Sequence, residues 1–154
     1  MKYSIRAGTH SDAPEIIALL PRLADFNVPK HRDPTELWQG DRSMIQQWAT
    51  GDKPEVDIAV ATVDNKVIGT VVVSAKKEML SGQPSVHLET LAIDASAEGH
   101  GIGSALILEA ETLASKRGAC CISLHVFSAN ARARALYERL GYHGELMRYY
   151  KPIN

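Results

Sequence analysis

The sequence lacks the features of secreted, membrane-spanning and nucleic-acid-binding proteins. Only two of its 154 residues are cysteines, and because Cys120 and Cys121 are neighbours without a Cys/His cluster, neither a disulfide framework nor a zinc site is expected. No apolar run approaches the ~20 residues of a membrane span, and the N-terminus lacks the apolar core of a signal peptide. A formal net charge of −1 gives no basic field for nucleic acid or anionic lipid. These absences predict a cytoplasmic protein with no metal, membrane or nucleic-acid partner.

The composition is that of an ordinary globular protein. Apolar residues make up 45% of the chain and charged residues 23%. A chain of this length can bury about two-thirds of its unfolded surface. No repeat, low-complexity tract or interdomain linker interrupts it. We therefore expect residues 1–154 to form a single domain.

Hydrophobic periodicity predicts the order of strands and helices. Alternating or β-rich runs predict strands over residues 3–7, 56–63, 67–73, 87–93, 121–127 and 145–151, and helical spacing predicts helices after Asp12 and Asp33, over 102–116 and from Asn130 to Gly141. Asp12 and Glu15 are expected to form a capping box, and Gly40-Asp41 to divide the second helix. The order β-α-α-β-β-β-α-β-α-β predicts an α/β (mixed α+β) fold, a mixed sheet with helices on both faces.

A glycine-rich turn, Glu98 to Ser104, joins the fourth predicted strand to the third predicted helix. The first turn of a helix has unpaired backbone N–H groups and the positive end of the macrodipole, so it can hold an anion. Gly99, Gly101 and Gly103 let a ligand approach with no Cβ in the way. The stretch predicts a turn that cradles phosphate.

Two common phosphate loops do not fit this turn. Walker A needs a lysine after its last glycine, and none follows Gly103. The dinucleotide fingerprint needs glycine at its sixth position, which is Ser104 counted from Gly99 and Leu106 counted from Gly101. Neither a P-loop nor a Rossmann unit is therefore expected.

A third kind of phosphate turn does fit. The residues Leu91-Ala92-Ile93-Asp94 and Glu98-Gly99-His100-Gly101-Ile102-Gly103 resemble the coenzyme A motif of the GNAT superfamily of N-acetyltransferases, Arg/Gln-x-x-Gly-x-Gly/Ala at a helix start. The block Asn130-x-x-Ala133-x-x-Leu136-Tyr137-x-x-x-Gly141-Tyr142 is similar to the superfamily's C-terminal signature. The resemblance covers essentially the whole chain in element order. It implies the GNAT fold, with a mostly antiparallel sheet splayed in the middle, where acetyl-CoA lies between the strands ending at Ile93 and Phe127.

The resemblance assigns roles to the residues at the splay. Its coenzyme-binding residues would be Leu91, Ala92, Ile93, Gly99, His100, Gly101, Ile102, Gly103, Ser104, Asn130 and Tyr137. A phenol of ordinary pKa about 10 can protonate the departing thiolate, so Tyr137 is the candidate general acid; the alternative is a tyrosine packed on the sheet. Asn130 either bonds the coenzyme or only caps its helix. A backbone N–H of the first splayed strand would stabilise the oxyanion.

The proton acceptor is left open between residues of one strand face. Glu89 is the first candidate and His87 the second, because both alternate with Leu91 and Ile93; the alternative is that they are surface residues. His125 could face the cleft from the neighbouring strand. Glu98 departs from the family pattern, which has Arg or Gln there, and an exposed carboxylate would repel a pyrophosphate by ~1 kcal/mol unless it points to solvent.

The resemblance implies an acetyl-CoA-dependent N-acetyltransferase that acts on the primary amine of a small molecule by direct transfer in a ternary complex. Two alternatives stay open: a non-catalytic acyl-CoA-binding sensor or interaction module, and a protein (N-terminal or lysine) acetyltransferase. The acceptor side of the cleft is expected in the region that includes Asp25, Phe26 and Trp38. By analogy with the superfamily, a homodimer is expected, with Met147 and Tyr149 at its interface.

Overall fold

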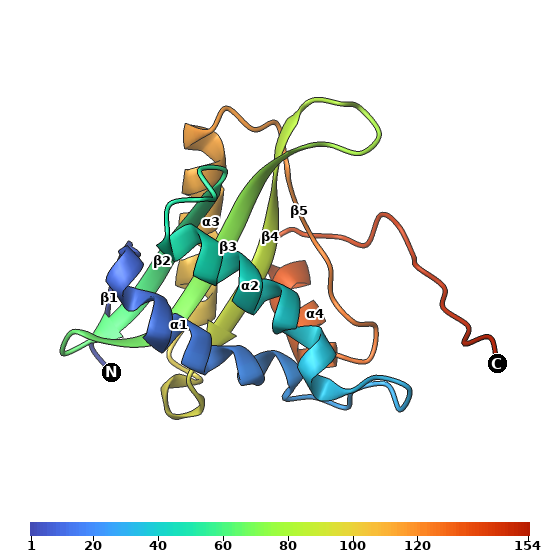
Figure 1. Ribbon diagram of the computed structural model, residues 1–154, viewed down its shortest axis with the longest axis horizontal. Helices are drawn as coiled ribbons and strands as arrows, with labels where there is room; N and C mark the ends of the chain where they lie inside the picture. Colours follow the sequence, from blue (N-terminus) through green and yellow to red (C-terminus); the bar gives the residue numbers. More distant parts are fainter.

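The computed structural model describes residues 1–154 and contains one five-stranded sheet (Figure 1). Its strands are β1 (Ser4–Ala7), β2 (Val56–Val63), β3 (Lys66–Lys77), β4 (Pro84–Ile93) and β5 (Ile122–Leu124), and they lie side by side in chain order. Neighbours from β1 to β4 are antiparallel, whereas β5 runs parallel to β4. The mixed, mostly antiparallel sheet is therefore confirmed.

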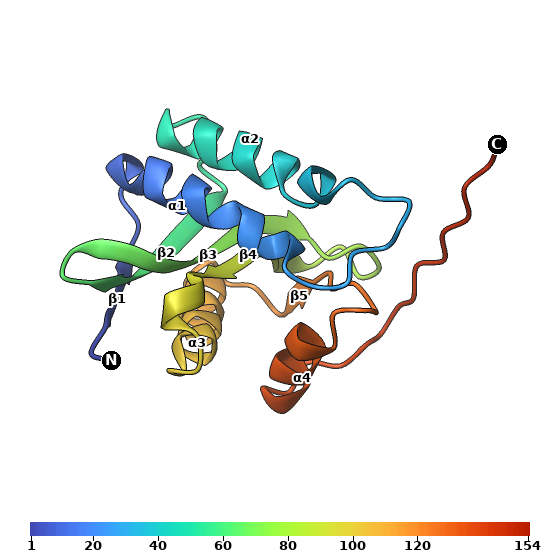
Figure 2. The same ribbon diagram turned by 90° about the horizontal axis from the view of Figure 1, so that it is seen from below.

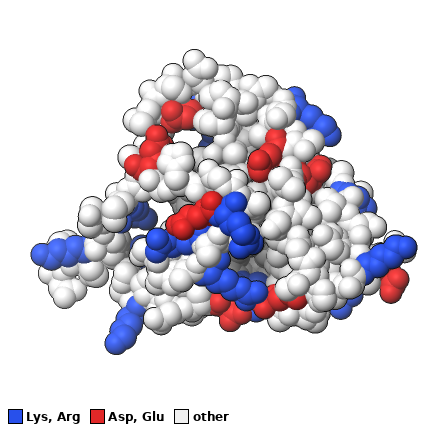
Figure 3. Space-filling model, turned by 180° about the vertical axis from the view of Figure 1, so that it is seen from behind, with Lys and Arg blue, Asp and Glu red and all other residues white.

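Helices cover both faces of this sheet, as predicted. Helices α1 (Ala13–Leu19) and α2 (Gln39–Ala49) lie on one face, and α3 (Ile102–Lys116) and α4 (Ala131–Arg139) on the other (Figure 2). Two 3-10 turns, η2 (Leu20–Ala24) and η3 (Pro34–Leu37), lie between α1 and α2. No helix is both long and apolar enough to cross a membrane. On the face in Figure 3, basic and acidic side chains are interspersed.

Alternation along β3 divides the apolar core into two layers. Val71 and Val73 pack on the α3 side, whereas Val72 between them packs on the α1 and α2 side. Leu106 of α3 and Ile16 of α1 are fully buried on these two sides. Each such side chain contributes about 1.5–3 kcal/mol by burial, so both helical layers are fixed against one sheet.

The sheet opens between β4 and β5. Only Val86, Leu88 and the residue between them pair with β5, and the rest of β4, as far as Ile93, has no strand on that side. The ladder between β3 and β4 is irregular at the same level, between Val72 and Val73, and such a bulge bends a strand. The splay implied by the resemblance is present. The strand predicted to reach Phe127 ends at Leu124 because its partner bends away.

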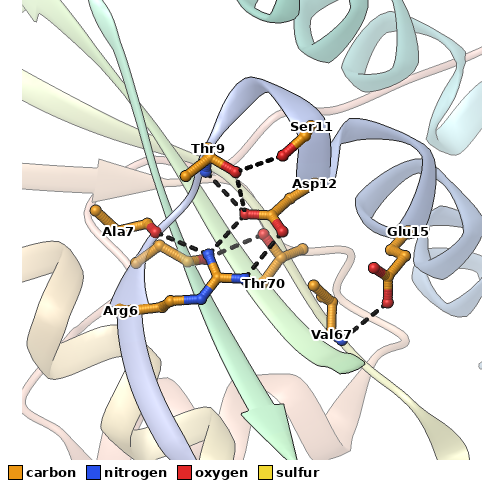
Figure 4. Close-up of polar contacts among 9 residues, drawn as sticks. Arg6, Ala7, Thr9, Ser11, Asp12, Glu15, Val67 and Thr70 are labelled. Carbon is orange, nitrogen blue, oxygen red and sulfur yellow. Dashed lines mark hydrogen bonds and ion pairs between the residues drawn. The ribbon is translucent and has the colours of Figure 1, made fainter. Parts of the chain in front are cut away.

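The predicted capping box at Asp12 and Glu15 is wrong. Asp12 instead accepts two hydrogen bonds from the Arg6 guanidinium, at 2.7 and 2.9 Å, and one from the Thr9 N–H at 2.8 Å (Figure 4). The Arg6 partner lowers the pKa of Asp12 to about 2, against the effect of burial. Glu15 accepts from the Val67 N–H at 2.9 Å. Charged tertiary partners hold these carboxylates more strongly than a local cap would.

The second helical region breaks at Trp38 rather than at Gly40-Asp41. Asp33 caps η3 by accepting a hydrogen bond from the Thr35 N–H at 2.9 Å, and Trp38, with φ −140° and ψ 0°, interrupts the chain before α2 begins. Gly40 and Asp41 therefore lie in the first turn of α2. Glycine is disfavoured in helices but does not forbid them, so packing decided the boundary.

The strand predicted over residues 145–151 is absent. No strand follows α4, and the tail runs away from the sheet (Figure 1). It is attached through Tyr150, whose ring stacks on His31 at 4.6 Å and lies 4.6 Å from the Arg32 guanidinium. Alternating apolar residues form a strand only beside another strand, and none lies within reach. The dimer interface at this tail stays a prediction.

Candidate active site

A cleft of about 550 Å³ runs along the open edge of β4. One end, which we call the glycine end, is lined by residues including Glu98, Gly99, Gly101, Ile102, Gly103, Ser104, Asn130, Arg132 and Tyr137. The other, which we call the carboxylate end, is lined by Phe26, Leu37, Asp41, Glu89, His125, Val126 and Phe127. The splay thus brings together groups from both halves of the chain.

Consecutive free N–H groups make the glycine end an anion cradle. From Gly99 to Ser104 no backbone N–H donates to a protein acceptor; the first helical bond runs from the Ala105 N–H to the Gly101 oxygen at 3.1 Å. Gly99 and Gly101 have φ of +77° and +76°, a conformation that glycine adopts without strain. Nothing lies within 4 Å of where their Cβ atoms would be, so a ligand can approach. The turn predicted from sequence has this geometry.

Gly103 is a glycine for a different reason. A Cβ there would lie 3.2 Å from Ile93 Cδ1 and 3.3 Å from Leu136 Cδ2. The small residue lets α3 approach both β4 and α4 closely. It therefore sets the width of the cleft at its glycine end.

Glu98 lines the cleft but is not a bare negative charge. Its carboxylate pairs with Arg22 from η2 and, at 3.0 Å, with Arg132 from α4. Arg22 also pairs with Asp25, so the four charges balance. The repulsion expected from sequence is thereby offset. Neither arginine could be assigned to Glu98 from the sequence, because both come from distant elements.

The open edge of β4 offers backbone groups to the cleft. The Asp94 N–H donates to the Ile68 oxygen of β3 at 2.9 Å. Because backbone groups alternate along a strand, those of Leu91 and Ile93 point toward the cleft and those of Ala92 toward β3. Arg22 Nε donates to the Ile93 oxygen at 2.9 Å. The Leu91 groups and the Ile93 N–H remain free for a ligand.

Tyr137 and Asn130 both reach the cleft from α4. Tyr137 is buried, its hydroxyl makes no protein hydrogen bond, and burial raises its pKa to about 12, so it stays protonated at neutral pH. Asn130 Oδ1 caps α4 by accepting from the Ala133 N–H at 3.2 Å, which leaves its amide N–H groups free. His100 is exposed and does not line the cleft, so it offers only its backbone.

The two predicted proton acceptors have different surroundings. Glu89 lines the cleft and accepts from Ser74 Oγ at 2.6 Å and from Lys76 at 2.9 Å. Burial acts to raise the pKa of Glu89, but these partners outweigh it and hold the pKa below its ordinary value. His87 does not line the cleft; its Nδ1 bonds to Ser123 Oγ at 2.8 Å, and its ring lies 4.7 Å from His125. Burial lowers the pKa of His87.

Asp41 is the cleft residue that the sequence reasoning missed. The sequence indicated only a helix break there, whereas the first turn of α2 brings its carboxylate to the cleft opposite β4. Phe26 and Phe127 form an apolar wall at this end, with ring centroids 5.5 Å apart. A helix start placed at Gln39 was the one signal that could have directed attention to Asp41.

Comparison with known proteins gives matches in both sequence and structure. The profile of the Acetyltransferase (GNAT) family matches residues 21–142. The N-acetyltransferase YhfO of Bacillus subtilis (strain 168), itself described as uncharacterized, is 28% identical over 139 residues, which cover 90% of this chain and 89% of that protein.

Two solved structures have the same fold. A ribosomal-protein-alanine N-acetyltransferase from Brucella melitensis biovar Abortus 2308 has a TM-score of 0.72 at 20% identity, over 99% of this chain and 100% of that one. AAC(6')-Iy, in complex with the bisubstrate analog CoA-S-monomethyl-acetylneamine, has a TM-score of 0.73 at 20% identity, over 100% of both chains.

Proposed function

The chain belongs to the GNAT family of acetyltransferases, and on that premise we propose that it moves the acetyl group of acetyl-CoA to the primary amine of a small molecule in a direct ternary complex. One observation carries the proposal. A single cleft joins an anion cradle to a pair of carboxylates, so a phosphorylated donor and a cationic acceptor fit its two ends. No transfer between separate sites is needed.

The glycine end fits coenzyme A. The free N–H groups from Gly99 to Ser104, including that of His100, suit a pyrophosphate, and Arg132 adds a cation beside them. The open edge of β4 at Leu91 and Ile93 suits pantetheine bound like an added strand, while Ala92 and Asn130 complete the wall. Bound there, the coenzyme supplies a thioester as the acetyl donor.

The chain's own residues supply the other steps. A carboxylate takes a proton from the acceptor ammonium, so that the amine nitrogen can attack. A free N–H of Leu91 or Ile93 stabilises the oxyanion, and the Tyr137 hydroxyl protonates the departing thiolate. Neither Cys120 nor Cys121 lines the cleft, so an acetyl-cysteine has no support and direct transfer is favoured.

The carboxylate end favours a compact acceptor. Phe26, Leu37 and Phe127 give it apolar walls, which suit a small amine better than a polypeptide segment. The similar structures include one named for a ribosomal protein and one bound to an acetylneamine analog, so the fold itself leaves the acceptor open. The non-catalytic alternative rested on the charge of Glu98, which Arg22 and Arg132 offset.

A thiol-release assay with acetyl-CoA and a panel of small primary amines tests this function. At least one amine should accelerate release well above the rate of hydrolysis. A terminal peptide of matched charge serves as the control for protein acceptors. If calorimetry shows coenzyme binding but no amine accelerates release, the protein is a binding module rather than an enzyme of this kind.

A further inference from the structure

Asp41 is a carboxylate in the cleft without a cationic partner. Every other charged group that lines the cleft near it is paired or balanced: Glu89 with Lys76, and Arg22 with Asp25. No lysine, arginine or histidine forms an ion pair with Asp41. A partly buried carboxylate loses hydration, so the site is disposed to take up a cation.

A buried hydroxyl without a partner lies beside this carboxylate. Thr90 is only 1% exposed, and its Oγ1 makes no hydrogen bond. Alternation along β4 places Thr90 on the same side as Ala92, which packs in the layer under α1 and α2. The hydroxyl is near enough to Asp41 to act against the rise in its pKa, without forming a well-aligned bond. Unsatisfied buried polar groups are rare and mark ligand or functional sites.

The surroundings of Asp41 separate it from Glu89. Burial raises the pKa of Asp41 to about 6, the Thr90 hydroxyl opposes the rise, and the charge of Glu89 adds to it. Glu89 is held as an anion by Ser74 and Lys76, so its affinity for a proton is low. Of the remaining titratable groups that line this part of the cleft, His125 faces it from the β5 side, and Arg22 and Asp25 bind each other.

The walls of this end restrict the rest of the ligand. Phe26 and Phe127 enclose an apolar space. Arg22, the cation nearest this end, is occupied by Asp25, Glu98 and the Ile93 oxygen, so no free cation is available for a substrate carboxylate. The chemistry at this end suits a positive amine on an apolar body.

We propose that Asp41 binds the acceptor ammonium and takes its proton, and that the acceptor is a primary amine on an apolar or aromatic body with no carboxylate. This inference rests on the proposed acetyl transfer. The ammonium gives one proton to Asp41, and the nitrogen lone pair forms the C–N bond as the C–S bond breaks. The thiolate takes the Tyr137 proton, the second proton lost by nitrogen restores Tyr137 through solvent, and Asp41 releases its own to solvent.

Steady-state kinetics of Asp41→Asn with phenethylamine and phenylalanine as probes test the inference. These probes share a body and differ by one carboxylate, so phenethylamine should have at least a ~10-fold higher kcat/KM. Asp41→Asn should lower kcat/KM by roughly 10²-fold and remove the acid limb of the pH profile near pH 6, with acetyl-CoA affinity unchanged. Asp64→Asn, at an exposed hairpin residue, is the matched control.

Thr90→Val gives a second variant of nearly the same volume, which should lower kcat/KM by roughly 5-fold through Asp41 and leave acetyl-CoA affinity unchanged. If the wild type is active and Asp41→Asn keeps both its rate and its acid limb, the inference is overturned while the proposed function stands. Equal use of phenylalanine overturns the acceptor class. If no amine accelerates release by the wild type, acetyl transfer itself fails, and coenzyme calorimetry identifies that case.

Discussion

The two ends of the cleft are built in different ways. At the glycine end, the groups that hold a ligand are mostly backbone N–H groups from one continuous stretch, Gly99 to Ser104. At the carboxylate end, they are side chains from separate elements, with Asp41 on α2, Glu89 on β4 and Phe127 after β5. Backbone donors need only a local conformation, whereas converging side chains need the packed fold.

Two carboxylates in the same cleft show the same contrast. Glu98 is balanced by Arg22 and Arg132, whereas Asp41 has no cation. The type of side chain does not decide which one repels, binds or takes a proton. Its neighbours do, because they set the energy of its charged form.

The largest expected effect lies where the two ends meet. Tyr137→Phe should lower kcat by roughly 10²-fold, since general acid catalysis contributes 10²–10⁴-fold. Coenzyme affinity should be unchanged, because the hydroxyl makes no protein hydrogen bond whose loss would disturb the site. Stopped-flow turnover and calorimetry together measure this. An unaltered kcat would move the proton donor elsewhere.

Arg132→Ala should break the charge balance of the glycine end. We expect coenzyme A to bind about 5- to 10-fold more weakly at low ionic strength, with a smaller difference at high salt, because Arg132 is 73% exposed and screened. The control is Arg134→Ala on the same helix, whose side chain bonds to the Ser128 oxygen and does not line the cleft. Equal losses in both variants would exclude a specific role.

Asp41→Asn should stabilise the fold at neutral pH. The folded pKa of about 6 exceeds the unfolded value of 3.8, so the folded state binds the proton more tightly and stability falls as pH rises between these values. Discounted for partial exposure, the free energy of unfolding should rise by about 1 kcal/mol at pH 7 and hardly at all at pH 4. Denaturant unfolding at both pH values measures this, with Asp64→Asn as control. A loss of stability at pH 7 would show that Asp41 has a partner.

The smallest effect is expected for Glu98→Gln. Removing its charge leaves Arg22 held by Asp25 and the Ile93 oxygen, and frees Arg132 for phosphate. Coenzyme A should bind roughly 3-fold more tightly at low salt, and the gain should vanish at high salt. Salt-dependent calorimetry decides it. Weaker binding would mean that Glu98 holds Arg132 in place.

Local rules predicted the parts of the fold that depend on local chemistry. The hairpin at Asp64 and Asn65, the glycine turn and the helix over residues 102–116 all appear as expected, because positive φ and helix start signals act within a few residues. The predictions that failed concern long-range partners. Asp12 binds Arg6 rather than capping α1, and residues 145–151 form no strand because no strand adjoins them.

The sequence by itself determined the fold class, the family resemblance and the anion cradle. Each depends on periodicity or on glycines whose conformational freedom is a property of the residue. Only the tertiary structure decided the charges of the cleft. It paired Glu98 with Arg22 and Arg132, fixed Glu89 against Lys76 and left Asp41 without a cation. Electrostatic energy falls off with distance in space, and distances between side chains of separate elements exist only once the chain is packed.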